Sequence, residues 1–384
     1  MRRGPSGKRI SGPSSKDEPF SAFVPNPLPP TPSLEISPVL RGELDAALVE
    51  LGRLDTIATL LPDSAVFLYA YVRREAVLSS QIEGTQSSLS DLLSYEAAQA
   101  PGVPLNDVRE VSNYVRALEF GRTRLRTLPL TGRFLQELHS VLLSKGRGDD
   151  KRPGEFRTSQ NWIGSTRPGN ATYVPPPPDR IGGLMTDLER FLNDVPERTP
   201  PLLKAALAHV QFESIHPFLD GNGRLGRLLV ALVLCADRLL SEPVLYLSLY
   251  LKRHRARYYE LLQLTRTEGE WEEWLAFFAK GVRETAQQAV ATARRLTEIF
   301  RDDRGRIEAM RGAAGSALRV HEALQKSAVS SIGGIAERTK LSFPTVQKAF
   351  DRLARIGIVR EITGKPRHRL YAYTAYLEAL ESGT

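Results

Sequence analysis

Cysteine is almost absent from this chain: Cys235 is the only one among 384 residues. A single cysteine excludes an intrachain disulfide and a cysteine-based metal cluster, and its place in the apolar run LLVALVLCA predicts a buried core residue. Long apolar runs are missing too, since no stretch approaches the roughly 18 uninterrupted apolar residues of a membrane span. No apolar segment follows the basic N-terminus. We therefore expect a cytoplasmic protein with no secretory signal and no contact with membranes.

A phosphate-binding loop of the Walker A type is also missing, since the pattern GxxxxGK[ST] does not occur. The formal net charge is +8, which allows an acidic partner such as nucleic acid or a nucleotide. From Arg301 to the last residue there are 15 Lys or Arg and 9 Asp or Glu. Most of the positive excess therefore lies in the last fifth of the chain.

The order of sequence patterns predicts a mainly all-α fold. Residues 1–35 are rich in Ser, Gly and Pro, which predicts a disordered tail followed by an extended arm. Apolar residues three and four apart predict an N-terminal helical region over residues 36–105 and a helical core over residues 106–300, with Trp271 and Trp274 buried in it. Between residues 146 and 181 this pattern breaks, and WIGSTRPGNATYV alternates like a short hairpin.

Residues 312–384 have a different pattern, typical of a winged helix-turn-helix domain. GGIAERTKL predicts one helix and SFPTVQKAFDRLARIG a second, with Ser342 as its N-cap and Pro344 in its first turn. We expect Phe343 and Phe350 in the core and a β-hairpin around Gly364. Such a domain binds DNA or serves as a protein-docking or dimer module. The residues that would face DNA are Thr345, Gln347 and Lys348 on the second helix and Lys365, Arg367 and Arg369 on the wing.

The densest group of chemically active residues is IHPFLDGNGRLGR, residues 215–227, which lies between two apolar runs. Gly221, Asn222 and Gly223 begin a helix, and backbone N–H groups at a glycine-rich helix N-terminus form a nest for phosphates. Asp220 directly before them supplies a carboxylate of the kind that Mg²⁺ takes beside phosphate oxygens.

Arg224 and Arg227 lie three residues apart on the same helix face, and their planar guanidinium groups suit polyphosphates. His216 precedes the helix, where a neutral imidazole can take a proton from a hydroxyl. No second histidine stands at a spacing that suits zinc. The segment therefore predicts a nucleotide-phosphate site.

HPFLDGNGRLGR resembles the HxFx(D/E)GNGRxxR signature of the Fic family at every defined position. The resemblance implies a helical protein that transfers AMP from ATP to a hydroxyl side chain of a target protein. It implies that His216 is the general base, that Phe218 anchors the loop and that Asp220 binds Mg²⁺. It also implies that the α-phosphate lies on Gly221, Asn222 and Gly223, and the β- and γ-phosphates on Arg224 and Arg227.

A second stretch, SSQIEGT, resembles the family's inhibitory motif (S/T)xxxE(G/N) at Ser79, Glu83 and Gly84. The resemblance implies that Glu83 pairs with Arg227 and removes that guanidinium from the γ-phosphate. It further implies that residues 160–175 form a flap on which an extended target docks, and that Tyr258, more than Tyr259, lines the adenine pocket. A homodimer follows by analogy with the family.

Two other functions stay open on the sequence alone. The same residues serve net removal of AMP from a modified protein, with Glu83 positioning a water. Alternatively, the chain is a DNA-binding regulator whose core only senses nucleotide, although an intact His216 disfavours a pure sensor. The motif specifies phosphates better than the base of the nucleotide.

Overall fold

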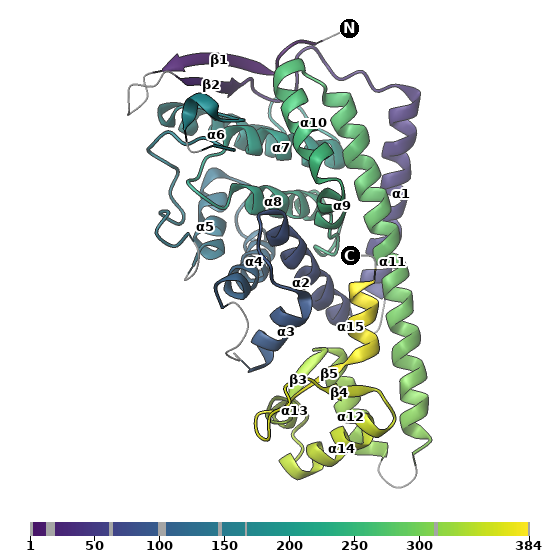
Figure 1. Cartoon of the computed structure of the whole chain (residues 1–384). Coiled ribbons are helices and arrows are strands. Elements are labelled where there is room, and N and C mark those ends of the chain that lie inside the picture. The colour runs from purple at the N-terminus through teal and green to yellow at the C-terminus, as the bar shows by residue number, and fades with distance from the viewer. Residues whose placement is uncertain are drawn as a thin grey trace.

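The computed structural model describes residues 3–12, 20–60, 64–98, 105–144, 148–165, 167–310 and 314–382. The described chain is mainly helical, as the sequence predicts, with two small antiparallel sheets. It is elongated (Figure 1), and the long helix α11 (Trp271–Glu308) extends from the upper body to the C-terminal domain. None of the described helices has the length and apolar character that crossing a membrane requires.

The N-terminal arm differs from the prediction. Strands β1 (Gly7–Gly12) and β2 (Phe20–Pro25) pair antiparallel along their whole length. Gly7–Gly12 is paired where a disordered tail was predicted, whereas β2 is extended, as the predicted arm is, and buries Phe20 and Ala22 against Val174. Composition alone does not show that so polar a segment carries an apolar face.

In the described part of the chain, ten helices build the body that surrounds the predicted site. Helices α7 and α8 pack against each other at its centre, and nearly every residue of both is buried. This burial explains the continuous apolar runs on either side of the 215–227 segment. The helices are α1 (Pro38–Leu60), α2 (Ser64–Ile82), α3 (Leu89–Ala98), α4 (Leu105–Arg124), α5 (Gly132–Leu142), α6 (Pro178–Leu192), α7 (Pro201–Ile215), α8 (Asn222–Ala236), α9 (Ser248–Arg253) and α10 (Arg255–Glu268); a 3₁₀ turn, η1, spans Pro168–Asn170.

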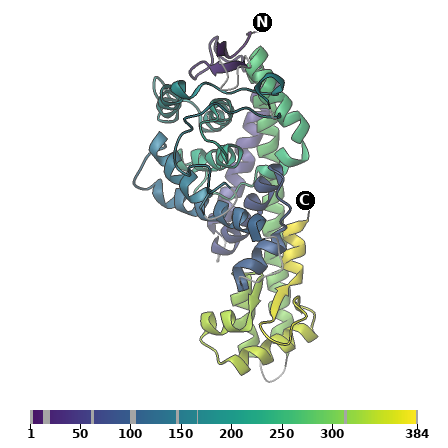
Figure 2. The ribbon, with the colours of Figure 1, turned by 60° about the vertical axis from the view of Figure 1, so that its left-hand side comes forward.

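Helix α1 runs alongside α11, and the pair forms the right-hand edge of the molecule in Figure 1; in the turned view of Figure 2 the two helices still lie next to each other. Trp271 and Trp274 at the start of α11 are buried, as predicted. Cys235 in the last turn of α8 is only partly buried, so the prediction of a core cysteine was wrong. The helix ends at Ala236, and its last turn already emerges from the core.

The C-terminal domain contains the predicted helix-turn-helix and hairpin, together with elements that the sequence analysis missed. The second helix, α14, begins after Ser342 with Pro344 in its first turn. Phe350 is buried, but Phe343 is 57% exposed, which contradicts the prediction for that residue. The sheet order is β3-β5-β4, and the elements are α12 (Ala314–Gln325), β3 (Val329–Ser331), α13 (Ile332–Thr339), α14 (Phe343–Arg355), β4 (Val359–Glu361), β5 (Leu370–Tyr373) and α15 (Thr374–Glu381).

Candidate active site

The predicted site is a short loop between the two central helices. Helix α7 ends at His216, whose backbone is left-handed at φ 48°, and α8 begins after Gly221 at φ 77°. A left-handed backbone is easy for glycine and costs a histidine about 1 kcal/mol, so the surrounding contacts have to hold His216 in place. The loop of residues 216–221 therefore stands on a rigid base and leads into the N-terminus of α8.

Asn222 fastens this loop from within. Its Oδ1 accepts a hydrogen bond from the Phe218 backbone N–H, and its Nδ2 donates to the Phe218 carbonyl, both at 2.9 Å. Phe218 itself is fully buried, as expected of the loop's anchor. The Asn222 side chain thus acts on the loop, and its backbone N–H remains the group that can face a phosphate.

His139 on α5 packs against the loop and holds it in place, and this residue was not predicted from the sequence. Its ring stacks on Phe218 with centroids 3.8 Å apart. Nδ1 accepts from the Gly154 N–H at 2.8 Å, so the proton sits on Nε2, which donates to the Asp220 carbonyl at 2.9 Å. Burial lowers the pKa of His139 to about 4, and the ring is therefore neutral near pH 7.

Arg157 ties the loop to the segment expected to form the flap, and it too was missed. The guanidinium is buried and donates to three carbonyls, those of His216, Ser159 and Pro176. The Arg157 backbone N–H donates to the Pro217 carbonyl at 2.9 Å. Burial lowers the pKa of Arg157 to about 10. These bonds account for the left-handed backbone of His216, because they hold its carbonyl in one direction.

The His216 ring is kept neutral by its surroundings. Burial is the main cause that lowers its pKa to about 3, and the positive charges of Arg157 and Arg266 contribute. Arg266 is fixed by hydrogen bonds to Ser214 Oγ at 3.0 Å and to the Glu213 carbonyl at 3.2 Å. A neutral imidazole at physiological pH accepts protons, which is the protonation state that a general base needs.

Asp220 stands at the mouth of the loop with its side chain 37% exposed. Its Oδ1 accepts from the Gly221 N–H at 2.6 Å, and the Arg224 guanidinium lies 3.5 Å from the same oxygen. Among the described residues no group of three or more His, Cys, Asp or Glu side chains gathers as metal ligands. A single exposed carboxylate beside a helix N-terminus fits Mg²⁺, which takes one or two carboxylates and completes its shell with phosphate oxygens and water.

Arg227 is occupied by both residues of the predicted inhibitory motif. Its Nη2 lies 2.7 Å from Glu83 Oε1, its Nε donates to Ser79 Oγ at 2.8 Å, and Nη2 also donates to the Ser79 carbonyl at 3.0 Å. Although burial acts in the opposite direction, the Arg227 charge holds the pKa of Glu83 below its usual value. A methyl group at Gly223 would collide with the Glu83 carboxylate, so this glycine gives Glu83 its access to α8.

Arg224 points to a different partner from the one expected. It is 2% exposed and forms an ion pair of 2.7 Å with Glu110 on α4, which the sequence analysis missed. Both side chains are almost fully buried, at 3% and 4% exposure. In this structure Arg224 is therefore held under the loop by Glu110.

Glu213 on α7 lies close to Arg227 but does not fully neutralise the positive charge of Arg227. Burial raises the pKa of Glu213 to about 7. Its Oε1 has no hydrogen-bond partner within the described ranges, and Gly226 on α8 leaves the room that the carboxyl group fills. Because a pKa of about 7 leaves Glu213 only partly ionised near pH 7, Glu83 supplies the larger negative charge beside Arg227.

Tyr258 is buried in this structure and Tyr259 is the more exposed of the two, so the role of either ring in an adenine pocket stays a prediction. The Tyr258 side chain is 1% exposed, and its hydroxyl donates to His209 Nε2 at 2.8 Å. His209 also stacks on Trp274. Tyr259 is 42% exposed and interacts electrostatically with Glu83. Of the pair, Tyr259 has the ring that a nucleotide can reach.

The predicted flap has only a minimal strand pairing in the described part of residues 160–175, which leaves out Thr166. Ile163 and Tyr173 form an isolated antiparallel bridge. The Phe23 N–H of β2 donates to the Val174 carbonyl at 2.9 Å, which joins the N-terminal hairpin to the flap. Tyr173 in turn donates to the Ser214 carbonyl, so the flap is attached to the end of α7.

Comparisons with known proteins agree with this site. Residues 42–123 match the model named Fic/DOC family N-terminal, and residues 129–234 match the Fic/DOC family model. The proteins called protein adenylyltransferase Fic of Drosophila sechellia and Drosophila yakuba are 32% and 33% identical over 208 residues. The aligned part covers 53% of this chain and 39% of each relative, so the chain spans about two fifths of their length.

Two solved structures share the fold at low sequence identity. A Fic family protein from Desulfovibrio desulfuricans G20 aligns with a TM-score of 0.55 at 20% identity, covering 88% of this chain and 97% of its own. Fic-1 from C. elegans aligns with a TM-score of 0.54 at 22% identity, covering 67% of this chain and 74% of the other. The first alignment extends well beyond residues 42–234.

Proposed function

Because the chain belongs to the Fic/DOC family, we propose that it is a protein adenylyltransferase, which moves AMP from ATP to a hydroxyl side chain of a target protein. The observation that carries the proposal is the His216–Arg227 segment itself. A neutral imidazole, an exposed carboxylate and the free N-terminus of α8 meet within one loop that other residues hold rigid. The curated relatives called protein adenylyltransferase support the same activity.

In the proposed reaction the target's Ser, Thr or Tyr oxygen attacks the α-phosphorus of ATP. One bond forms between that oxygen and phosphorus, the α–β phosphoanhydride bond breaks, and pyrophosphate leaves. His216 accepts the hydroxyl proton. The backbone N–H groups at Asn222 and Gly223 bind the phosphate oxygens, on which charge develops, and the Gly221 N–H joins them once it leaves Asp220 Oδ1. Mg²⁺, held through Asp220, would neutralise phosphate charge.

We also propose that the structure represents an inhibited state. With Glu83 and Ser79 occupying Arg227, that guanidinium is not available to a γ-phosphate. Glu83 is 35% exposed and stands just beyond the end of α2, so a modest movement would release it. ATP bound to the inhibited state would lack one of its phosphate contacts and sit in an unproductive position.

The target would dock on the flap of residues 160–175 by adding an extended strand to it. The N-terminal hairpin supports this flap at Val174 and Tyr173. We keep as proposals an N-terminal region of residues 36–105, a core of residues 106–300, a winged helix of residues 312–384 and a homodimer. Residues 312, 313, 383 and 384 lie outside the described part of that last domain.

DNA binding by the C-terminal domain is a second proposal, and a charge imbalance favours it. Residues 340–369 contain eight Lys or Arg and two Asp or Glu. None of these cations forms an ion pair within the described part of the chain, although surface cations usually have carboxylates nearby. A cavity of about 530 Å³ separates the start of α14 from the β4–β5 hairpin, lined by Phe343, Gln347, Arg367 and Arg369 among others. Unpaired cations of this kind suit a phosphate backbone.

Label transfer from ATP labelled in its α-phosphate tests the first proposal. Wild type, Glu83→Gly, and Glu83→Gly combined with His216→Ala would be incubated with Mg²⁺ and a lysate. Strong labelling by Glu83→Gly and none by the double variant is expected. Release of AMP from a modified protein, with no labelling by any variant, would instead assign the site to AMP removal.

The fluorescence anisotropy of a labelled DNA duplex, measured over a series of salt concentrations, tests DNA binding by the C-terminal domain. Arg367→Ala is expected to weaken this binding.

A further inference from the structure

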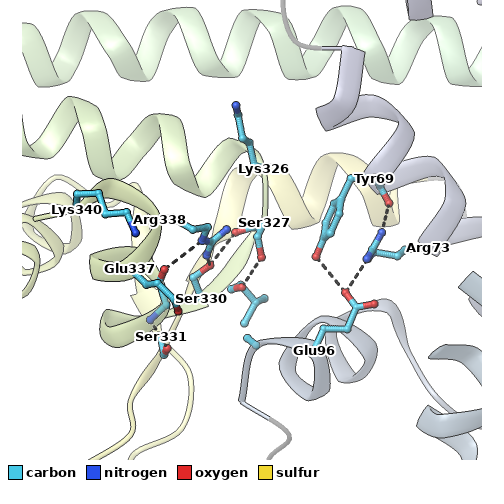
Figure 3. A pocket seen from close by; sticks show the side chains of 13 residues that line it. Tyr69, Arg73, Glu96, Lys326, Ser327, Ser330, Ser331, Glu337, Arg338 and Lys340 are labelled. Atoms are coloured by element: carbon cyan, nitrogen blue, oxygen red, sulfur yellow. Dashed lines mark hydrogen bonds and ion pairs between the residues drawn. The ribbon is translucent and has the colours of Figure 1, made fainter. Parts of the chain in front are cut away.

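A second large cavity lies away from the 216–221 loop, between α2, α3 and the C-terminal domain (Figure 3). Its volume is about 720 Å³, within the range of small-molecule sites. One wall carries Tyr69 and Arg73 of α2 and Glu96 of α3. The opposite wall belongs to the C-terminal domain and includes Lys326, Ser327, Ser330, Glu337, Arg338 and Lys340.

The α2 wall is electrically balanced. Arg73 Nε donates to Glu96 Oε2 at 2.7 Å, and the Tyr69 hydroxyl donates to the same oxygen at 3.2 Å. The Arg73 guanidinium also covers the Tyr69 ring, 3.6 Å from its centre. This wall therefore presents a fixed arginine whose charge is already matched by one carboxylate.

The C-terminal wall has excess positive charge. Arg338 donates to Ser330 Oγ and to the Gly334 and Ala323 carbonyls, all of which are uncharged. Neither Arg338 nor Lys340 forms an ion pair in the described part of the chain, and Glu337 is the one carboxylate on this wall. Figure 3 shows Arg338 reaching toward Ser330 from α13. A guanidinium that is bound only to neutral oxygens beside serine hydroxyls is ready to bind an oxyanion.

From this arrangement we propose that the cavity binds a small molecule carrying a phosphate monoester, with its phosphate on Arg338 and Lys340. A compact dianion matches the two positive charges of Arg338 and Lys340. The remaining volume would hold the rest of the molecule against Tyr69 and Arg73. A duplex phosphate backbone is the less suitable occupant, because the cavity is bounded by α2 and α3 as well as by the C-terminal domain.

The position of this cavity gives its occupancy a consequence for the active site. Helix α2 forms one cavity wall and also supplies Ser79, ten residues and about 15 Å beyond Tyr69 along the same helix. The C-terminal domain already holds α2 near this point, because Arg74 donates to the Ser382 carbonyl at 2.9 Å. A ligand that contacts both walls adds to this hold, and so favours the position in which Ser79 and Glu83 occupy Arg227. This consequence, unlike the binding itself, rests on the proposed function.

Calorimetry on the full chain tests the site, with ribose 5-phosphate, inorganic phosphate and ribose as probes. We expect ribose 5-phosphate to bind, inorganic phosphate to bind more weakly and ribose not to bind. Arg338→Ala should weaken binding by at least about tenfold, the loss expected for a charge-assisted hydrogen bond. Lys340→Ala, an exposed change that leaves the fold intact, should weaken it by about threefold. Arg360→Ala on β4 is the matched control outside the cavity and should bind like wild type.

Equal affinity of wild type, Arg338→Ala and Lys340→Ala would overturn the proposal and assign any phosphate binding to the 216–221 loop. Ribose that binds as tightly as ribose 5-phosphate would overturn the choice of ligand. A DNA duplex that displaces ribose 5-phosphate would assign Arg338 and Lys340 to a nucleic-acid surface.

Hydrogen exchange tests the coupling without relying on catalysis. Saturating ribose 5-phosphate should slow exchange of the amides in the C-terminal half of α2, and unchanged exchange would refute the coupling. Label transfer provides the second readout, with inhibition expected in wild type and none in Glu83→Gly. Slower exchange with no transfer by either protein would leave the ligand site standing and refute the adenylyltransferase proposal.

Discussion

Glu83→Gly is the substitution whose effect can be derived most directly from the structure. The Glu83 carboxylate is bound to Arg227 Nη2 at 2.7 Å. The Ser79 hydroxyl and carbonyl hold the same guanidinium at 2.8 and 3.0 Å. The substitution removes the Glu83 carboxylate, which is the only full negative charge among these contacts. The two hydrogen bonds from Arg227 to Ser79 stay in place. Arg227 then has a free donor and an uncompensated charge, which an ATP phosphate can bind.

The size of the effect follows from the bond that is lost. A hydrogen bond to a charged group contributes about 1.5–3 kcal/mol, which corresponds to a roughly 10- to 100-fold change in the population of free Arg227. We therefore expect Glu83→Gly to raise the rate of label transfer by about 10- to 100-fold. Ser79→Ala removes one bond to a neutral oxygen, which contributes about 1 kcal/mol, and should raise the rate about fivefold.

The assay is the initial rate of label transfer from α-phosphate-labelled ATP, measured beside ATP affinity. Glu83→Gln is the matched control, because it keeps the side chain's length and a neutral acceptor, and its rate should fall between those of wild type and Glu83→Gly. If Glu83→Gly and wild type bind ATP equally well and label a target at the same rate, the contact with Arg227 is not inhibitory and the reasoning fails.

Three further predictions concern charged and titratable groups in and around the site and the core. Glu110→Gln removes the closer carboxylate of the buried Arg224, leaving it with Asp220 at 3.5 Å, and should destabilise the protein by about 3 kcal/mol, seen as a lower midpoint in thermal unfolding. Four histidines with pKa values of about 3 to 4 are neutral in the resting folded protein above pH 5 and take up protons from solvent on unfolding, whereas Glu75 and Glu213, with pKa values raised to about 7, release theirs. The free energy of unfolding should therefore fall as the pH drops below 6.5, by about 2 kcal/mol per pH unit near pH 5.5. Denaturant titrations measure this free energy, and a constant value over that pH range would contradict the prediction. The histidines are His139, His209, His216 and His321. Asp220→Asn removes the proposed Mg²⁺ ligand and should lower label transfer by about 100-fold in the Glu83→Gly background, while unfolding is unchanged.

The chemistry of the site could be predicted because most of it is local in sequence. His216 to Arg227 are twelve consecutive positions, and the glycines and apolar runs around them fix a loop followed by a helix. The Glu83–Arg227 contact spans 144 residues, and only the resemblance to a known motif indicated it. The Arg224–Glu110 pair has no such motif, and no spacing rule connects α8 with α4.

Supporting residues were missed for the same reason. Arg157 and His139 hold the loop through its backbone carbonyls, and any position in the chain can supply such a donor. The N-terminal strands show the opposite error, because the composition predicted a disordered tail and an unpaired extended arm where Phe20 and Ala22 supply a buried face to a paired strand. Phe343 was assigned to the core for being aromatic, although it stands at the exposed first turn of α14.

The two arginines of the motif are both held by carboxylates, and the difference between these pairs indicates which of them can open. Glu110 is 4% exposed and Arg224 3%, so separating them would leave two charges without water. Glu83 is 35% exposed and can exchange Arg227 for solvent. Separating Glu110 from Arg224 costs several kcal/mol, whereas separating Glu83 from Arg227 costs about the free energy of one hydrogen bond. Regulation of this site should therefore act through Glu83, and Glu110→Gln should change stability far more than it changes the ratio of transfer rates between wild type and Glu83→Gly.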